Sequence, residues 1–434
     1  MSFKILIIGQ GGREHAIAWN LSKHSEVDSI YVAPGNGGTF LEENVTNINI
    51  RSEDTESLIE FAKKNSINLT IVGPEAPLVD GIVDEFMKEG LKIFGPIKEH
   101  SKLEGSKVFA KLFLERNDIS TAFYKSFSKN RDAKEFLKDQ KFPIVVKADG
   151  LASGKGVIIA EDFDDACKAV DALLNEDGSK MVVIESFLTG IELSSIFICN
   201  DNNKVGLPWV KDYKSRDEYN SGPNTGGMGA VTHPLSFEHK NFVFKLNLAI
   251  QDIFKKTVTG INNETSSNYL GFLYIGLMID NKGKANVLEY NCRFGDPETQ
   301  NIMMLFNFKN WNLLDFITDN VELPPLSIER NLYACTIVLA AQGYPGNFKK
   351  NFFIDLSNID ESNHLKIIHA GTTISNQKIK VTGGRILSVN VIAESKDAAI
   401  KIAYENIEKI KAYEDEEFKK ENNSLIFFRK DIGN

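Results

Sequence analysis

Residues 4–16 read KILIIGQGGREHA, a short apolar run that ends in glycines and leads into a helical pattern. Comparable runs follow at SIYVAP (29–34), LTIVGP (69–74) and LKIFGP (91–96), and helical patterns lie at 13–24 and 54–65. β-Rich runs that alternate with helices predict βαβ units and a parallel sheet that is covered on both faces. Each run ends in Gly or Pro, at the carboxyl edge where open α/β sheets bind ligands. The sequence therefore predicts an N-terminal open parallel α/β domain with a ligand site at this edge.

Further along the chain, the pattern predicts two more units. After a helix that starts near Ser106, the strand-like runs are FPIVVKADG (142–150), GVIIAED (156–162) and MVVIESFL (181–188), with a helix near 163–175. They predict a small α+β lid subdomain at about 122–190. Strands dominate again from 191 to 291, around a helix at about 240–257 and a glycine-rich loop at 221–229. The paired prolines of VELPPLSIER (321–330) predict a boundary before a small C-terminal α+β domain with a helix at 396–411. We expect three domains, at 1–105, 106–322 and 323–434.

Composition excludes several classes of protein. Apolar residues make up 42% of the 434-residue chain and charged residues 25%, values typical of folded globular proteins. A net charge of -9 argues against a protein that coats nucleic acid. Four cysteines at least 32 residues apart form no CxxC pair, and no HExxH motif is present, which argues against a disulfide framework and a zinc enzyme. The apolar runs are strand-sized, so we expect no signal peptide, no membrane span and a cytoplasmic location.

The first glycine-rich motif is Gly9-Gln10-Gly11-Gly12-Arg13-Glu14, between a strand and a helix. Free N–H groups and the helix dipole favour an anion there. A nicotinamide cofactor is disfavoured because Glu14 takes the place of the third glycine and no acidic residue follows the second strand, where the chain reads APGNGGT (33–39). That second loop suits a phosphate or a sugar better. The alternative is that both loops are ordinary tight turns.

A second motif, KADGLASGKG (147–156), places Lys147 at a strand end before a glycine-rich loop. Backbone N–H groups of such a loop can close over phosphates while the lysine supplies a point charge. Gly156 stands where a Walker A motif needs Ser or Thr, so the loop is not of that class. An ordinary hairpin is the alternative.

A third motif, LEYNCRFGDPE (288–298), begins inside a strand, so that Glu289, Asn291 and Arg293 alternate onto one face. Glu289 and Asn291 offer hard oxygen ligands that suit Mg²⁺. Arg293 could hold a carboxylate with two hydrogen bonds. An exposed polar strand face is the alternative.

Eight motifs, in order, resemble one family: GGREHA, PGNGGT, IVGPEAPLV, KADGLASGKGV, SGPNTGGMGA, EYNCRFGDPETQ, AAQGYPG and HAGT. The chain resembles the phosphoribosylamine–glycine ligase (glycinamide ribonucleotide synthetase) family of ATP-grasp enzymes from residue 4 to about 433. The resemblance implies that glycine is joined to 5-phosphoribosylamine in purine biosynthesis while ATP is cleaved to ADP and phosphate. It implies an ATP-grasp core with a mobile lid, and one activity for this chain.

For ATP and metal, the resemblance assigns roles by position. Lys107 and Lys147 would bind the nucleotide phosphates, and the loop of 150–156 would close over them through Gly150, Ser153, Gly154, Lys155 and Gly156. The hinge that meets adenine would comprise Glu185, Phe187 and Leu188, and Glu192 would bind the ribose hydroxyls. Glu289 and Asn291 would hold Mg²⁺ or Mn²⁺. The preceding strand-like segment, 273–277, offers no second carboxylate.

For the other substrates, the resemblance makes Arg293 the group that orients the glycine carboxylate and the tetrahedral oxyanion, and Lys147 a second catalytic residue. Glycine or phosphoribosylamine would also contact Asp212, Lys214, Asn224, Gly226 and Asp296. The phosphoribosyl group would lie on the N-terminal loops, at Gly11, Gly12, Arg13, Gly35, Asn36 and Gly37. The family commonly has a QDHKR-like segment where this chain reads KDYKS (211–215). Asp212 and Lys214 match it, whereas Lys211, Tyr213 and Ser215 depart from it.

An amide ligase must activate a carboxylate, so the resemblance implies a glycyl phosphate that the amine of phosphoribosylamine attacks. The expected partners are these two small substrates, without nucleic acid or membrane, and a transient contact with the enzyme that supplies phosphoribosylamine. Three alternatives stay open. They are an ATP-grasp ligase with another acceptor, a nucleotide-binding regulatory protein without turnover, and a nicotinamide oxidoreductase.

Overall fold

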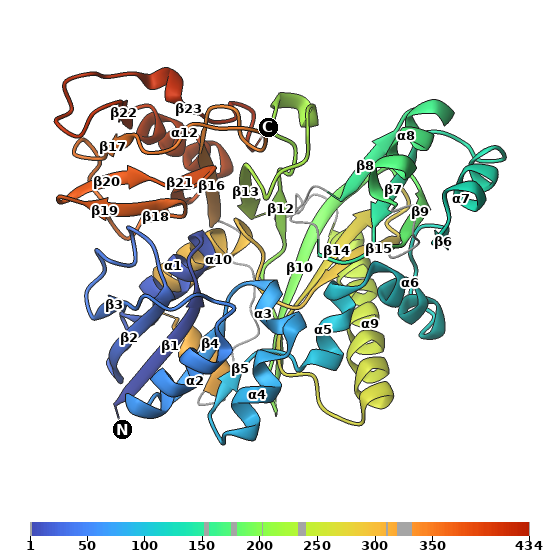
Figure 1. Ribbon diagram of the computed structural model, residues 1–434, viewed down its shortest axis with the longest axis horizontal. Coiled ribbons are helices and arrows are strands. Elements are labelled where there is room, and N and C mark those ends of the chain that lie inside the picture. The colour runs from blue at the N-terminus through green and yellow to red at the C-terminus, as the bar shows by residue number, and fades with distance from the viewer. Residues whose placement is uncertain are drawn as a thin grey trace.

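The computed structural model describes residues 2–151, 156–174, 180–201, 203–232, 240–309, 311–318 and 332–433. Its elements form an N-terminal sheet, a small sheet at the far side of the molecule, and a long central sheet that continues into the C-terminal part of the chain (Figure 1). The predicted mixture of an open parallel α/β unit, an ATP-grasp-like core and a C-terminal α+β unit is confirmed in outline.

The N-terminal sheet has the strand order β3-β2-β1-β4-β5, and all its pairings are parallel. Its strands are β1 (Phe3–Gly9), β2 (Val27–Pro34), β3 (Val45–Asn47), β4 (Leu69–Val72) and β5 (Ile93–Phe94). The accompanying helices are α1 (Gly12–Leu21), α2 (Thr55–Lys64), α3 (Glu75–Asp80), α4 (Ile82–Lys88) and α5 (Lys98–Gly105). The predicted parallel sheet is therefore confirmed, although the LKIFGP run contributes only two strand residues.

The small sheet is antiparallel, with the order β6-β9-β7-β8. It comprises β6 (Tyr124–Phe127), β7 (Ile144–Ala148), β8 (Val157–Ala160) and β9 (Val182–Ser186), with α7 (Asn130–Leu137) and α8 (Phe163–Leu173). Helix α6 (Lys107–Arg116) precedes it, and the Ser106 side chain caps that helix by accepting a hydrogen bond from Phe109 N. The small sheet and its helices enclose a hydrophobic core of their own, centred on Val146, Val170 and Ile184. This separate core makes the subdomain a packing unit distinct from the central sheet.

The central sheet contains ten strands among the described residues. Its main path is β15-β14-β10-β12-β13-β16-β21-β18. Strand β11 pairs with β10, and β23 pairs with β16. The strands before residue 300 are β10 (Ile191–Cys199), β11 (Lys204–Gly206), β12 (Val210–Asp212), β13 (Gly229–Thr232), β14 (Gly271–Ile279) and β15 (Ala285–Asn291). Those after it are β16 (Tyr333–Ala341), β18 (Leu365–His369), β21 (Arg385–Ala393) and β23 (Ile426–Phe427). The pairing of β13 with β16 makes one continuous sheet of the core and the C-terminal strands.

Three helices belong to the core: α9 (Lys240–Thr265), α10 (Glu298–Phe308) and α11 (Leu313–Thr318). Helix α9 is longer than the predicted 240–257. The C-terminal part adds a sheet in the order β19-β20-β17-β22, from β17 (Phe353–Asp355), β19 (Thr372–Ser375), β20 (Lys378–Val381) and β22 (Lys411–Tyr413), and the helix α12 (Lys396–Ile407). Two short 3₁₀ helices are η1 (Glu218–Asn220) and η3 (Asn423–Leu425). The predicted boundary at 322–323 lies outside the described residues.

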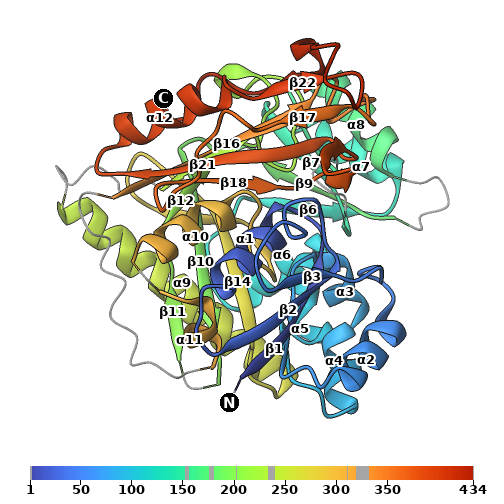
Figure 2. The same ribbon diagram turned by 90° about the vertical axis from the view of Figure 1, so that its left-hand side faces the viewer.

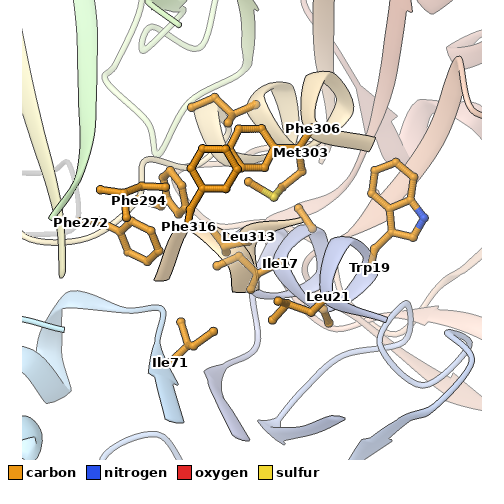
Figure 3. Packing of buried hydrophobic residues seen from close by; sticks show 14 of the residues in the cluster. Ile17, Trp19, Leu21, Ile71, Phe272, Phe294, Met303, Phe306, Leu313 and Phe316 are labelled. Carbon is orange, nitrogen blue, oxygen red and sulfur yellow. The ribbon is translucent and has the colours of Figure 1, made fainter. Parts of the chain in front are cut away.

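One hydrophobic core joins the N-terminal sheet to the central sheet (Figure 3). Helices α1 and α10 pack against each other, and Ile17 of α1 and Phe306 of α10 are fully buried. The rings of Phe272 and Phe294 stack with centroids 3.9 Å apart. Figure 2 shows α1 and α10 beneath the C-terminal strands β18 and β21, which they contact. This packing holds the carboxyl edge of the N-terminal sheet beside the end of β15.

Among the residues that the structure describes, no helix has the length and apolar character needed to cross a bilayer.

Candidate functional site

Strand β15 carries two of the predicted site residues. Its register with β14 pairs Glu289 with Gly276 and Asn291 with Tyr274. Glu289 and Asn291 therefore lie on one face, as the alternation along the strand predicts. Arg293 follows the end of the strand and is half-buried.

Glu289 lies among positive charges. Its Oε1 atom is 3.4 Å from Lys214 Nζ. Burial alone would raise the pKa of Glu289, but the charges of Lys214 and Lys147 outweigh burial and lower the pKa to about 2. Lys107 and Arg293 act in the same direction. The carboxylate is thus ionised at neutral pH in a region rich in cations, which is the environment a site for polyphosphate and a divalent cation requires.

Lys214 connects the predicted nucleotide and substrate residues. It donates to Glu192 Oε1 at 2.6 Å and lies 4.0 Å from Asp212 Oδ2. Burial would lower the pKa of Lys214, but Asp212 and Glu192 outweigh that effect and raise it. Lys214 therefore stays charged, and it holds together three carboxylates that would otherwise repel one another.

A buried ion cluster surrounds Arg293. Its guanidinium lies 3.0 Å from Glu104 Oε1 and 3.3 Å from Glu75 Oε2, and it donates to Phe294 O at 3.1 Å. Burial raises the pKa of Glu104 to about 7, against the opposing effect of Arg293. The sequence motif predicts an arginine free to bind a substrate carboxylate, whereas the structure pairs it with two protein carboxylates.

The amide of Asn291 is oriented by this cluster. We assign the amide with Nδ2 toward Glu104 Oε1 and Tyr290 O, at 2.9 and 3.3 Å, because this places a donor against both acceptors. In this assignment Oδ1 turns away from them and can serve as an oxygen ligand. Together with the ionised Glu289, it makes a donor set that fits a hard divalent cation.

The predicted phosphate lysines lie where α6 and β7 approach β15. Lys107, the first residue of α6, donates to Gly150 O at 2.8 Å. Lys147 on β7 lies 3.1 Å from Glu185 Oε2 and donates to Leu288 O at 3.3 Å. The Gly156 carbonyl accepts from Ala148 N at 2.8 Å, which closes the base of the loop. Ser153, Gly154 and Lys155 lie outside the described residues.

The predicted adenine hinge lies at the end of β9, with Glu185 in the strand and Phe187 and Leu188 after it. Phe187 is exposed and Leu188 is half-buried. Glu185 is only 2% exposed, and its Oε2 atom contacts both Lys147 and Lys111, at 3.1 and 3.0 Å. The Glu185 side chain is therefore turned toward buried lysines. Sequence reasoning missed Lys111, whose only signal is its position one helical turn after Lys107.

The first glycine-rich loop differs from the predicted anion site. Gly11 N donates to Glu14 Oε2 at 2.5 Å, so the Glu14 carboxylate occupies the positive end of α1. A Cβ atom at Gly73 would collide with this carboxylate, and one at Gly9 would lie 2.6 Å from Glu14 Cγ. Glu14 thus fills the space that the glycines leave. A phosphate beside Gly11 and Gly12 would meet a negative charge there, which weighs against that prediction.

Arg13 and Asn36 are also engaged by the protein. Arg13 donates to Glu14 Oε1 at 2.7 Å and to Phe294 O at 2.9 Å. Asn36 Nδ2 donates to the carbonyls of Gln10, Gly11 and His369, at 2.9, 3.1 and 3.0 Å. Its Oδ1 atom accepts from the N–H groups of Gly38 and Thr39. Asn36 is 5% exposed, and these hydrogen bonds give it a structural role in the loop, while its contact with substrate stays a prediction.

The rest of the second loop is fixed to the C-terminal part of the chain. Gly37 N donates to Thr372 O at 3.0 Å. Gly35 adopts φ +75°, and a side chain there would collide with Asn47. The loop of 35–37 therefore serves as an interdomain contact.

The loop of 221–229 folds back beside Lys214. Thr225 N donates to Lys214 O at 2.8 Å, and Asn224 pairs with Ser215. Arg385 donates to Gly226 O, and also to Asp296 O at 2.8 Å. Its guanidinium lies 3.0 Å from Asp296 Oδ2. Sequence reasoning missed Arg385, which comes from a strand about 90 residues after Asp296 in the chain and gave no motif of its own.

The chain matches three family models. Residues 3–104 match the N domain of phosphoribosylglycinamide synthetase, 105–299 its ATP-grasp (A) domain, and 334–434 its C domain. Together these matches cover most of the chain, in the order of the three structural units.

Curated relatives and solved structures agree with these matches. The chain is 43% identical to the phosphoribosylamine–glycine ligase of Clostridium acetobutylicum, with 99% of each chain covered. It is 42% identical to that of Vibrio cholerae, over 92% of this chain and 94% of the relative. The crystal structure of phosphoribosylamine–glycine ligase from Thermotoga maritima superposes with a TM-score of 0.79 at 32% identity, over 99% of this chain and 100% of that one. Biotin carboxylase from Campylobacter jejuni, at 14% identity and a TM-score of 0.70 over 97% and 98% of the two chains, shares the fold.

The matches of the three domains and the full-length identity show that the chain belongs to the phosphoribosylglycinamide synthetase (phosphoribosylamine–glycine ligase) family of ATP-grasp ligases.

Proposed function

We propose that this protein joins glycine to 5-phosphoribosylamine in purine biosynthesis, with ATP cleaved to ADP and phosphate. The observation that carries the proposal is the ionised Glu289 carboxylate, which lies among Lys214, Lys147 and Lys107 at the end of β15. A polyphosphate needs nearby ammonium groups to neutralise its charge, and the divalent cation that accompanies it needs a carboxylate ligand. The family membership supplies the substrates. We keep the division at 1–105, 106–322 with a lid at about 122–190, and 323–434 as the organisation for this reaction.

In the proposed ATP site, Lys107 and Lys147 neutralise phosphate charge, and the loop of 150–156 covers the phosphates. Glu289 and Asn291 Oδ1 would hold Mg²⁺ or Mn²⁺, and nucleotide oxygens and water would complete the coordination. When bound, the cation would withdraw negative charge from the phosphates. Before the nucleotide binds, the Lys147 ammonium contacts Glu185 Oε2 and Leu288 O, beside the position proposed for the phosphates.

Glycine needs activation because a carboxylate is a poor electrophile. In the proposed reaction, a glycine carboxylate oxygen attacks the γ-phosphorus and ADP leaves, which gives glycyl phosphate. The amine of phosphoribosylamine then attacks the acyl carbon, phosphate leaves, and the amine loses a proton. We assign the glycine carboxylate to the cationic region of Arg293 and Lys214, and the ribosyl substrate to the side of Asn224, Gly226 and Asp296.

Water would hydrolyse glycyl phosphate, so the site must be closed during the reaction. We propose that the small sheet of β6–β9, with its own core, moves over the nucleotide as the lid. The four cysteines are free thiols, which supports a reducing, cytoplasmic setting. The short lifetime of phosphoribosylamine supports a transient contact with the enzyme that supplies it.

Oxygen-isotope transfer tests this route. With glycine labelled by ¹⁸O in its carboxylate, one labelled oxygen should appear in the phosphate released during each turnover. Release of unlabelled phosphate would contradict the formation of a glycyl phosphate intermediate. The same reaction with a different amino acid in place of glycine should release no ADP above background, and turnover with it would contradict glycine as the substrate.

A further inference from the structure

The buried lysine Lys111 takes no part in the proposed reaction steps. It lies on α6, one turn after Lys107, and is 3% exposed. Its ammonium is 3.0 Å from Glu185 Oε2, and the ammonium of Lys147 is 3.1 Å from the same oxygen. One buried carboxylate is therefore shared by two buried cations.

Further hydrogen bonds hold the two lysines of this group, Lys111 and Lys147, against β15. Lys111 donates to Thr121 Oγ1 at 2.6 Å, and that hydroxyl donates to Val287 O at 2.6 Å. Lys147 donates to the adjacent carbonyl, Leu288 O, at 3.3 Å. Lys147 thus contacts the strand directly, and Lys111 through Thr121, immediately before Glu289. The second carboxylate oxygen of Glu185, Oε1, is buried without a hydrogen-bond partner.

The balance of charge in this group gives Lys111 a function. A buried carboxylate is costly unless a cation accompanies it. If Lys147 were the sole partner of Glu185, the two would form a neutral pair, and the lysine would be held there. Lys111 supplies a second counter-ion, so that Lys111, Lys147 and Glu185 together, here called the trio, carry one net positive charge. Lys147 can then turn toward an anion while Glu185 keeps a cationic partner.

We propose that Lys111 is a positioning residue, which retains Glu185 so that the charge of Lys147 serves the nucleotide phosphates. This inference rests on the proposed function, in which Lys147 binds those phosphates. Lys111 itself does not touch the nucleotide. Because the Glu185 side chain is turned toward the two lysines, loss of Lys111 should weaken the binding of the phosphates more than that of adenosine.

Calorimetric titration of ADP and of adenosine tests the proposal, because the ratio of the two dissociation constants isolates the phosphates. In Lys111→Met, the trio becomes neutral, and ADP should bind at least about tenfold more weakly while adenosine binding changes less than about twofold. Lys111→Arg, which keeps the charge, should retain the ADP affinity within about threefold. Lys102→Met removes an exposed lysine on α5, paired with Glu99, as a control and should change neither constant.

Glu185→Gln provides the decisive second change. Added to Lys111→Met, it leaves Lys147 without a competing carboxylate and should restore the ADP to adenosine ratio of the wild type. The single variant Glu185→Gln should leave the ratio of the ADP and adenosine dissociation constants unchanged or shift it in favour of ADP. This measurement remains possible even if Lys111→Met does not fold. An equal loss of ADP and adenosine affinity in Lys111→Met, or no restoration in the double variant, would overturn the proposal.

Lys147→Met separates this inference from the proposed function. It should itself weaken ADP relative to adenosine. If it does not, the assignment of Lys147 to the phosphates fails, and the role of Lys111 fails with it. If Lys147→Met weakens ADP and Lys111→Met does not, the positioning role alone is wrong.

Discussion

The ammonium of Lys214 lies 3.4 Å from Oε1 of Glu289, although β10 and β14 separate their strands in the sheet. The contact is possible because Lys214 follows the end of β12 and the 221–229 loop folds back on it. A predicted substrate residue thus touches a predicted metal ligand. A divalent cation at Glu289 would compete with Lys214, and release of that lysine on cation binding would make its charge available to substrate.

Glu289→Gln tests the role of this carboxylate in chemistry. Glutamine has nearly the same shape as glutamate, so we expect the fold to be retained. It lacks the negative charge, so the divalent cation and ATP should be held poorly. We expect kcat to fall by about 100-fold or more. Initial rates of ADP release and a thermal unfolding midpoint measure the two effects. Wild-type turnover in a folded variant would remove Glu289 from the mechanism.

Arg293→Lys tests the ion cluster beside it. A lysine cannot reach Glu75, Glu104 and the Phe294 carbonyl together, and Glu104 is buried. We expect a loss of about 2 kcal/mol of unfolding free energy, together with a rise of about tenfold in the KM for glycine.

Urea unfolding and initial rates against glycine concentration check these two effects. The exposed pair of Arg116 with Glu264 offers a matched control, since Arg116→Lys should cost less than about 0.5 kcal/mol. If the KM for glycine is unchanged while stability falls, Arg293 is structural and does not hold the glycine carboxylate.

Asn36→Asp distinguishes a structural role, in which Asn36 holds neighbouring backbone segments together, from a role in substrate binding. The amide makes three donations to backbone carbonyls, and a carboxylate would place its oxygens against them inside the protein. We expect a loss of about 3 kcal/mol or more in unfolding free energy. The exposed Asn263→Asp should be neutral within about 0.5 kcal/mol. A stable variant with a raised KM for phosphoribosylamine would instead favour direct contact with the substrate.

One contribution to the pH dependence of stability comes from His369, whose pKa burial lowers to about 3, with His15 and Lys366 acting in the same direction. The folded state binds fewer protons there than the unfolded state, whose histidine titrates near 6.5. The stability contribution is complete above pH 6.5 and is lost as pH falls toward 3. Between pH 7 and pH 5 this histidine should account for about 2 kcal/mol.

The measurement is urea unfolding of the wild type and of His369→Gln at pH 7 and pH 5. The wild type should lose more stability on acidification than the variant, by about the stated amount. Glu42 adds a further loss only below about pH 4.5: burial would raise its pKa, but His15 and Lys366 lower it to about 2. Equal losses in both proteins would show that His369 is not the origin of the effect.

The sequence predicts the N-terminal sheet well because its signal is local. Each apolar run has strand length and ends at a glycine or proline, and the parallel order follows from the helices between them. Local patterns do less well at element ends. Helix α9 continues to Thr265, and α12 ends at Ile407, before β22 begins at Lys411.

The candidate site was predicted where its residues follow one another in a motif, as Glu289 and Asn291 do. Residues that contact the site from distant segments of the chain belong to no motif, so the sequence did not predict them. Glu104 meets Arg293 across 189 residues of chain, and Arg385 meets Asp296 across 89. The same limit explains Glu14 and Asn36. The sequence places both in glycine-rich loops, but only the folded structure satisfies their polar groups within the protein and so weighs against a phosphate there.

The most direct test of the central claim is ADP release with ATP, Mg²⁺ and glycine, with and without phosphoribosylamine formed in place from ribose 5-phosphate and ammonia. We predict ADP formation that requires both substrates, with a product of the mass of glycinamide ribonucleotide. ATP binding without ADP formation from this pair would contradict the assigned reaction while leaving the fold assignment intact. Lys211, Tyr213 and Ser215, where the sequence differs from the segment expected from the resemblance, would then be the first residues to examine.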